Sequence, residues 1–361
     1  MKNLVSNLNY ELFNVINFKE INNDKLLTLV DSVKGITIRN IALKTRVLIS
    51  FLRFPFKIYF CDAHIIHANP SFNFIALIRE GLFIIVSALF KRRIVVFIHG
   101  WDPKVEKKVM TNKLLLRIFQ KVYNKSNVLI VLSHDFKEKL FQMGIKKRIL
   151  VETTMVDDKL VSGVNIQAKS KTTNNEHTIR ILFLSRIVRT KGIYEAIESF
   201  CILSRNYDNI ELLIAGDGPE LQAVKGYVKS HHLSNIKFLG YVGGEAKKKV
   251  FLKSHVYFFP TYHGEGMPIS VLEAMTFGLP VVTRAVGGLK DFFKNGVHGY
   301  ITDSRDPKYF AYLLDKLIDN ESLRTKISAF NYNYARKRFL ASEVTKRIES
   351  IYLNLMENGK L

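Results

Sequence analysis

The second half of the chain repeats one pattern, in which short runs of Ile, Val, Leu and Phe alternate with segments of helical spacing. The runs are predominantly apolar, which predicts strands whose two faces are both covered. Strands that alternate with helices in this way form a parallel sheet with crossover helices. We therefore predict a parallel α/β domain over residues 179–341, with strands at Ile179–Arg186, Ile210–Gly216, Ile236–Leu239, Val256–Pro260, Pro280–Arg284 and Gly299–Thr302.

The first half alternates in the same way but less regularly. The expected strands are Tyr10–Asn17, His64–Ala68, Ile94–His99, Val128–Leu132 and Ile149–Thr153, and the expected helices are Asp24–Phe54, Phe72–Phe90, Val105–Tyr123 and Asp135–Met143. Arg79 and Glu80 interrupt the most apolar window, Phe72–Phe90, so it fits a buried helix better than a membrane span.

Together the two halves predict two Rossmann-like α/β domains with parallel sheets, which face a cleft. The N-terminal domain is expected over residues 1–165 and the C-terminal domain over 179–341. Between them, residues 166–178 are polar and read as a linker. A final helix, from about residue 342 to residue 361, is expected to pack back on the N-terminal domain.

Charge and cysteine content limit the partners and the compartment. Lys and Arg number 54 against 32 Asp and Glu, and the net charge of +22 favours nucleic acid, anionic lipid or phosphorylated small molecules. The two cysteines, Cys61 and Cys201, are far apart, which excludes a disulfide scaffold and a cysteine zinc cage and fits a reducing compartment. Asp-x-Asp, Gly-x-Gly-x-x-Gly and Gly-x-x-x-x-Gly-Lys motifs are absent, which disfavours metal-bridged diphosphate, dinucleotide and P-loop sites.

The sharpest motif runs from Glu265 to Glu273 and follows the strand Val256–Pro260. Pro268 suits a helix start, because its missing N–H would be unpaired there, and Gly278 suits the helix end. Glu265 is then expected in the loop just before the helix, and Glu273 about one turn into the helix. A Gly-rich connection with two solvated glutamates is the alternative. Backbone N–H groups suited to a sugar or phosphate oxygen belong to Gly266, Met267 and Ile269.

Three further motifs follow other predicted strands, at the sheet edge where ligands of open α/β sheets bind. Arg186 and Lys191 are five residues apart across a turn, so both can converge on one diphosphate, unless the loop is simply a solvated basic one. The turn Ala215–Pro219 allows a ligand to approach the backbone, although such turns are common. His99 ends the strand Ile94–His99 at the matching edge of the N-terminal domain, where a structural role is the alternative.

These motifs, taken in order, resemble the retaining GT-B glycosyltransferases of family 4. The resemblance covers the second half of the chain. It extends from Ile181–Arg186 and Lys191-Gly192 through Gly216–Pro219, Glu265–Met275, Gly278–Val282, Gly287-Gly288 and Asn295-Gly296 to Gly299.

The resemblance implies a role for each matching residue. Arg186 and Lys191 would hold the nucleotide diphosphate and supply the charge that a metal supplies elsewhere, so no metal and no other cofactor is expected. Glu273 would accept the ribose hydroxyls, Glu265 would lie against the donor sugar, and His99 would lie near that sugar. The remaining donor-binding positions would be Gly216, Asp217, Gly218, Val242, Gly266, Met267 and Pro268.

The activity that the resemblance implies is transfer of a hexosyl or N-acetylhexosaminyl group with retention of configuration. The donor would be a UDP- or GDP-sugar and the acceptor a glycan or a polyprenyl-diphosphate-linked molecule, in the synthesis of bacterial lipopolysaccharide, capsule or exopolysaccharide. A catalytically silent GT-B subunit and a nucleotide-sugar epimerase of the same architecture are the alternatives. Nucleic acid is not expected as a partner, because no motif that reads it is present.

Two features of the first half bear on the acceptor and on the compartment. The family begins with a strand and a Gly-rich loop, whereas Tyr10–Asn17 is followed by Phe18–Asn23 without glycine, so the family's first strand is expected upstream of Met1 or is missing. Basic and aromatic residues are interspersed within Ala42–Phe60, and lysines are frequent within Lys104–Lys125. These surfaces predict a cytoplasmic enzyme docked peripherally on the anionic inner face of the cell membrane, the alternative being a solvated face over core aromatics.

Overall fold

The structure is a computed structural model, and it describes residues 64–167, 169 and 177–358, with the strand Phe13–Ile16 and residues 55 and 58–60. The predicted helix Asp24–Phe54 and most of the basic segment Ala42–Phe60 lie outside the described residues. The chain divides into two compact units, residues 1–153 with 345–361, and residues 154–344. This division falls before the segment 166–178, at which the sequence analysis put the linker.

The first unit is built on a five-stranded sheet with the order β1-β2-β4-β6-β7. Strands β2, β4, β6 and β7 are parallel, and β1 pairs with β2 in the antiparallel direction at the edge. A two-residue pair, β3 with β5, lies beside this sheet. The bounds are β1 Phe13–Ile16, β2 Ile65–Ala68, β3 Ser71–Phe72, β4 Arg93–Ile98, β5 Gly100–Trp101, β6 Val128–Val131 and β7 Arg148–Val151.

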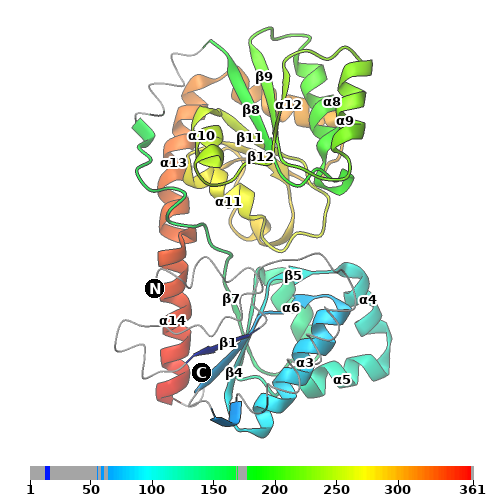
Figure 1. Cartoon of the computed structure of the whole chain (residues 1–361), viewed down its shortest axis with the longest axis vertical. Helices are drawn as coiled ribbons and strands as arrows, with labels where there is room; N and C mark the ends of the chain where they lie inside the picture. The colour runs from blue at the N-terminus through cyan, green and yellow to red at the C-terminus, as the bar shows by residue number, and fades with distance from the viewer. Residues whose placement is uncertain are drawn as a thin grey trace. The chain divides into compact units, whose positions relative to one another are not determined.

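The helices of the first unit correct one prediction, because Val105–Tyr123 is not a single helix. Asn112 has an extended backbone, with φ −101° and ψ 106°, and separates α4 from α5. Its side-chain oxygen accepts hydrogen bonds from the N–H groups of Leu114 and Leu115 at 3.0 and 3.1 Å, which caps α5. The helices are α3 Phe74–Leu89, α4 Pro103–Thr111, α5 Lys113–Tyr123 and α6 His134–Gln142 (Figure 1).

Helix α14, Ala341–Asn358, supplies the residues after 344 that belong to the first unit. The Tyr352 hydroxyl forms a hydrogen bond with Nδ1 of His67, a buried residue of β2. Arg347 Nε donates to a carboxylate oxygen of Glu152 at 2.8 Å. The end of the chain is therefore bound to the β2 and β7 region of the first unit by polar contacts as well as by packing.

The second unit has a six-stranded parallel sheet with the order β10-β9-β8-β11-β12-β13, and each strand overlaps a predicted one. The predicted α/β class is therefore confirmed. The strands are β8 Ile179–Leu184, β9 Ile210–Ala215, β10 Ile236–Gly240, β11 Val256–Phe259, β12 Val281–Arg284 and β13 Gly299–Thr302.

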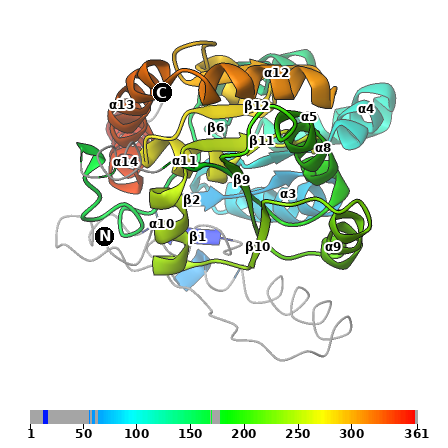
Figure 2. The same ribbon diagram turned by 90° about the horizontal axis from the view of Figure 1, so that it is seen from above.

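Helices cover both faces of the second sheet, as its apolar strands require. Helices α8 and α12 pack together on one face, and α11 and α13 pack together on the other (Figure 2). β8 and β11 are neighbours in the middle of the sheet, so the loops that leave their carboxyl ends lie side by side. The helices are α8 Ile193–Leu203, α9 Leu221–Ser230, α10 Gly244–Lys253, α11 Ile269–Thr276, α12 Pro307–Ile318 and α13 Glu321–Phe339, with short 3-10 helices η1 Arg189–Lys191 and η2 Gly287–Asp291.

Helix α3 corresponds to the predicted helix Phe72–Phe90, but only one of its faces is buried. Leu77, Phe83 and Ile84 are buried, whereas large apolar side chains on the opposite face are exposed. The expectation of a buried helix is therefore correct for one face and wrong for the other. Among the described residues, no helix combines the length and the hydropathy that a membrane span requires.

Glu80 is the one acidic residue of α3, and it is buried. Arg79 Nε donates to its Oε1 at 2.9 Å, while Oε2 has no hydrogen-bond partner within the described part of the chain. Burial raises the pKa of Glu80 from 4.5 to about 7, and the positive charge of Arg79 only partly offsets this. The first unit therefore holds Glu80 more readily in its protonated form.

We predict that the first unit loses stability as the pH rises from about 4.5 through 7, because the unfolded chain ionises Glu80 earlier than the folded one. Glu80→Gln should remove up to about 3 kcal/mol of this loss, as 1.4 kcal/mol corresponds to each pKa unit. Urea unfolding at pH 5 and pH 8.5, followed by the fluorescence of the single tryptophan, Trp101, measures it. Exposed Glu138→Gln is the control, and equal pH dependence in both variants would contradict the prediction.

Candidate functional site

Two loops meet at the carboxyl ends of β8 and β11. The first carries η1 and the second runs over Thr261–Glu265. The N–H of Tyr262 donates to the carbonyl oxygen of Thr190 at 2.9 Å. Gly192 has φ +83°, and a Cβ there would lie 2.3 Å from the carbonyl oxygen of Pro260. The two loops can therefore approach this closely only because residue 192 has no side chain.

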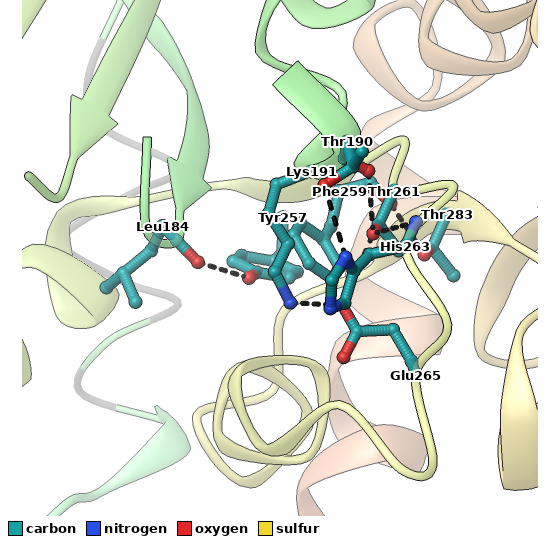
Figure 3. Close-up of polar contacts among 9 residues, drawn as sticks. All are labelled: Leu184, Thr190, Lys191, Tyr257, Phe259, Thr261, His263, Glu265 and Thr283. Atoms are coloured by element: carbon teal, nitrogen blue, oxygen red, sulfur yellow. Dashed lines mark hydrogen bonds and ion pairs between the residues drawn. The ribbon is translucent and has the colours of Figure 1, made fainter. Parts of the chain in front are cut away.

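The contact between these loops brings opposite charges together. Lys191 Nζ forms an ion pair with Glu265 Oε1, and the Thr261 hydroxyl lies 3.3 Å from the same oxygen (Figure 3). The side chains of Lys191 and Glu265 are only 17% and 13% exposed. Two residues that the sequence analysis assigned to one site from different motifs are thus in direct contact.

Hydrogen bonds from neighbouring residues fix the surroundings of this pair. The Thr190 hydroxyl lies 3.2 Å from Nδ1 of His263, an exposed residue between Thr261 and Glu265 (Figure 3). The Thr283 hydroxyl donates to the carbonyl oxygen of Phe259 at 2.7 Å, which ties β12 to the end of β11. His263 is a polar neighbour that the sequence analysis did not select.

Tyr257 is a fully buried residue of β11, the strand that leads into the loop Thr261–Glu265. Its hydroxyl donates to the carbonyl oxygen of Leu184 at 2.9 Å. Burial raises the pKa of Tyr257, and the negative charges of Glu273 and Glu265 raise it further. The Tyr257 hydroxyl thus ties β11 to the end of β8, next to the loop that carries Arg186.

Glu273 lies on α11 and is only 6% exposed. Lys247 Nζ, on α10, lies 2.5 Å from its Oε1. Burial raises the pKa of Glu273, and the charge of Lys247 acts in the opposite direction. The sequence analysis missed Lys247, which is one of three consecutive lysines. The pairing keeps a buried carboxylate compensated, as a buried charge requires.

The backbone before α11 is held by a second close approach. Gly287 has φ +49°, and a Cβ there would lie 2.0 Å from the carbonyl oxygen of Gly266 and 2.4 Å from that of Glu265. The N–H of Gly288 donates to the carbonyl oxygen of Gly266 at 2.8 Å. Met267 is buried, and Pro268 is the N-cap residue of α11, with φ −71°.

The loop after β9 packs against the loop after β8. Cβ atoms placed at Gly216 and Gly218 would lie 1.8 Å from the carbonyl oxygen of Ser185 and 2.3 Å from that of Ile187. Between these glycines, the carbonyl oxygen of Asp217 accepts a hydrogen bond from the N–H of Ile187 at 2.9 Å. The predicted donor-binding loop Gly216–Gly218 is therefore in backbone contact with the loop that carries Arg186.

Three further residues that the sequence analysis selected are Arg186 and Val242, in the second unit, and His99, in the first. The Arg186 side chain is exposed and makes no ion pair within the described residues, and Val242 is half-buried after β10. His99 belongs to the first unit, where its Nε2 lies 2.9 Å from Oδ1 of Asn69. Burial lowers the pKa of His99 to about 4, so the ring is neutral at pH 7. Within the described residues, His, Cys, Asp and Glu form no group of three that could hold a metal ion.

Comparison with known proteins supports the interpretation of the second unit. Residues 165–334 match the sequence profile of the family described as glycosyl transferases group 1. The capsular polysaccharide biosynthesis glycosyltransferase CapM of Staphylococcus aureus is 30% identical over 183 residues, which are 49% of this chain and 47% of CapM. The putative colanic acid biosynthesis glycosyltransferase WcaL of Salmonella typhimurium is 22% identical, over 75% of this chain and 65% of WcaL. The chain thus spans about half the length of CapM and about two thirds of WcaL.

The fold has solved counterparts. The structure of Anabaena Alr3699/HepE in complex with UDP and glucose is similar with a TM-score of 0.66 at 18% identity, over 89% of this chain and 84% of that one. The predicted GT-B fold, with a parallel α/β sheet in each of two units apart from the antiparallel edge strand β1, is confirmed.

The contact of Gly287 with the backbone of Glu265 and Gly266 can be tested by adding one methyl group. Gly287→Ala should lower the free energy of unfolding by roughly 3 kcal/mol, because positive φ and a backbone clash both oppose the Cβ. Gly296 also has positive φ, +77°, but nothing lies within 4 Å of its Cβ position. Gly296→Ala should therefore lower it by about 1 kcal/mol. Urea unfolding by circular dichroism compares them, and equal losses would argue against the clash.

Proposed function

We propose that the protein is a glycosyltransferase that moves a sugar, with retention of configuration, from a nucleoside diphosphate sugar to a glycan or polyprenyl-diphosphate-linked acceptor of bacterial surface polysaccharide. The observation that carries the proposal is the contact between Lys191 and Glu265 at the carboxyl edge of the sheet. A single nucleoside diphosphate sugar could therefore contact both side chains. Lys191 would bind its diphosphate, and Glu265 would accept hydrogen bonds from its sugar hydroxyls. The similarity to CapM and WcaL supports the polysaccharide role.

In the proposed reaction, the bond between the anomeric carbon and the terminal phosphate oxygen breaks, and its electron pair leaves with the nucleoside diphosphate. The acceptor hydroxyl forms the new bond on the same face of the sugar, and its proton passes to the departing phosphate oxygen. Lys191 and Arg186 would neutralise the charge that develops on the leaving group. They would lower the barrier because that charge is larger in the transition state than in the bound donor.

Each carboxylate has a separate proposed role. Glu265 would release Lys191 to the diphosphate and accept a hydrogen bond from a hydroxyl of the donor sugar. Glu273 has one oxygen on Lys247, and its other oxygen would accept from the ribose. Because the two side-chain cations supply the positive charge, we propose that the reaction needs no added metal, and transfer should persist in EDTA. A uridine diphosphate sugar is the first donor to test, because HepE is known in complex with UDP.

A panel of UDP-, GDP- and ADP-sugars with membrane lipid extracts as acceptors tests transfer, and analysis of the product's anomeric linkage tests retention. Lys191→Ala should lower kcat by about 10²–10³-fold, since it removes a preorganised charge from the leaving group. Lys308→Ala removes an equal charge from an exposed position of α12 and should keep normal kcat. Both variants should unfold like the parent protein, and comparable turnover in the two would refute the role of Lys191.

Lys247 is expected to keep Glu273 ionised for ribose binding. Lys247→Ala should weaken UDP binding by about tenfold, or 1.4 kcal/mol, and the deficit should shrink as the pH rises because the pKa of Glu273 climbs without its counter-charge. Calorimetric titration with UDP between pH 5.5 and 8.5 measures this. Lys247→Arg should restore binding, and exposed Lys249→Ala should not alter it. A pH-independent deficit would point to a packing role instead.

A further inference from the structure

The outward face of α3 is apolar along the whole helix. Its exposed positions recur at intervals of three, four and seven residues, so they form one stripe opposite the buried face. Ile75 and Leu89, near the two ends, are 77% and 75% exposed. We call this set the α3 stripe, and it consists of Ile75, Ile78, Leu82 and Leu89.

Helix α5 extends the apolar surface. The Tyr123 hydroxyl of α5 donates to the carbonyl oxygen of Leu77 at 3.0 Å, and Val122 packs beside Gly81, so α5 lies directly against α3 (Figure 1). Leu114 and Ile118, four residues apart on the solvent side of α5, are also exposed. Contiguous exposed apolar surface of this kind marks an interaction site on a soluble protein.

Positive charges surround this apolar surface. Lys108 Nζ lies 4.7 Å from the centre of the Phe74 ring at the start of α3. Lys113 and Arg117 are exposed on α5 beside Leu114 and Ile118. At the end of α5, an open hollow of about 500 Å³ is lined by Gln120, Lys121, Asn124, Gly144, Lys146 and Lys147.

Acidic side chains are scarce in the same region. From Phe74 to Tyr123 the sequence contains only Glu80, Asp102 and Glu106 as acids. Glu80 is buried, and Glu106 forms an ion pair with Lys139 at 3.2 Å. A second copy of this surface would bring like charges together, which disfavours a symmetric dimer through this face. The occupant that fits is apolar inside and negatively charged at its surface.

We propose that the α3 stripe and the solvent side of α5 dock on an anionic lipid surface, such as the inner face of the cell membrane. Helix α3 would lie in the plane of the interface, with the stripe among the upper parts of the acyl chains. The lysines and Arg117 have long side chains that can reach the phosphate groups while their stems stay in the apolar layer. The proposal does not depend on sugar transfer, because lipid binding is measured without donor or acceptor.

The test is flotation of the full chain with vesicles of phosphatidylcholine alone and with vesicles containing about one third phosphatidylglycerol. Wild-type protein should float with the anionic vesicles and much less with the neutral ones. Leu82→Glu should lower the partition coefficient at least tenfold. Leu353→Glu places the same charge at an equally exposed leucine of α14 (43% against 46%) and should bind like the wild type.

The cations are tested separately. Each of Lys113→Ala and Arg117→Ala should lower binding to anionic vesicles about fivefold, which corresponds to about 1 kcal/mol for one charge near such a surface. Binding to neutral vesicles should not change. Lys308→Ala, in the second unit, is the control for loss of net charge.

Three results would overturn the proposal. The first is equal flotation of wild type and Leu82→Glu. The second is a wild-type dimer that Leu82→Glu converts to a monomer while neither binds vesicles, which would assign the face to a second copy. The third is slow alkylation of Ile75→Cys without lipid compared with Tyr309→Cys, an exposed site of α12, which would show that this chain covers the stripe itself. Fast alkylation that anionic vesicles suppress is the supporting result.

Discussion

The loops at the carboxyl edge of the second sheet touch backbone to backbone, and this contact requires the absence of Cβ atoms. Gly192 lies against Pro260, Gly216 against Ser185 and Gly287 against Gly266, each closer than any side chain would allow. The positions of Lys191 and Glu265 are consequently set by main-chain packing, not by the mobility of long side chains. A site held in this way needs little reorganisation when a ligand arrives.

Much of the second unit could be predicted because its signals are local. Predominantly apolar runs define the strands, and Pro268 and Gly278 mark the ends of α11 as expected. The meeting of Lys191 and Glu265 was also predictable, since both follow strands of one parallel sheet and such strands end at the same edge. The roles of these residues remain predictions, as do those of Arg186 and His99.

Predictions from the sequence were wrong or incomplete where the structure depends on which residues pack together. Asn112 ends one helix and caps the next, but a single asparagine within a long helical pattern gives a weak signal compared with glycine or proline. Lys247 is one of three adjacent lysines, and only the fold shows which of them reaches Glu273. Apart from Arg79, Glu80 and Ser87, helix α3 has no charged or hydroxyl side chain, so its sequence gives little indication of which face turns outward.

The pairing of Lys191 with Glu265 has a consequence for selectivity. A bare anion such as chloride must displace a carboxylate that is already bound to Lys191, and it leaves that partly buried carboxylate without a partner. A molecule that carries both a negative group and hydroxyl donors satisfies the two charges at once. Glu265 therefore acts as a built-in counter-ion of Lys191. Small inorganic anions displace it poorly, whereas a ligand with both a negative group and hydroxyl groups displaces it well.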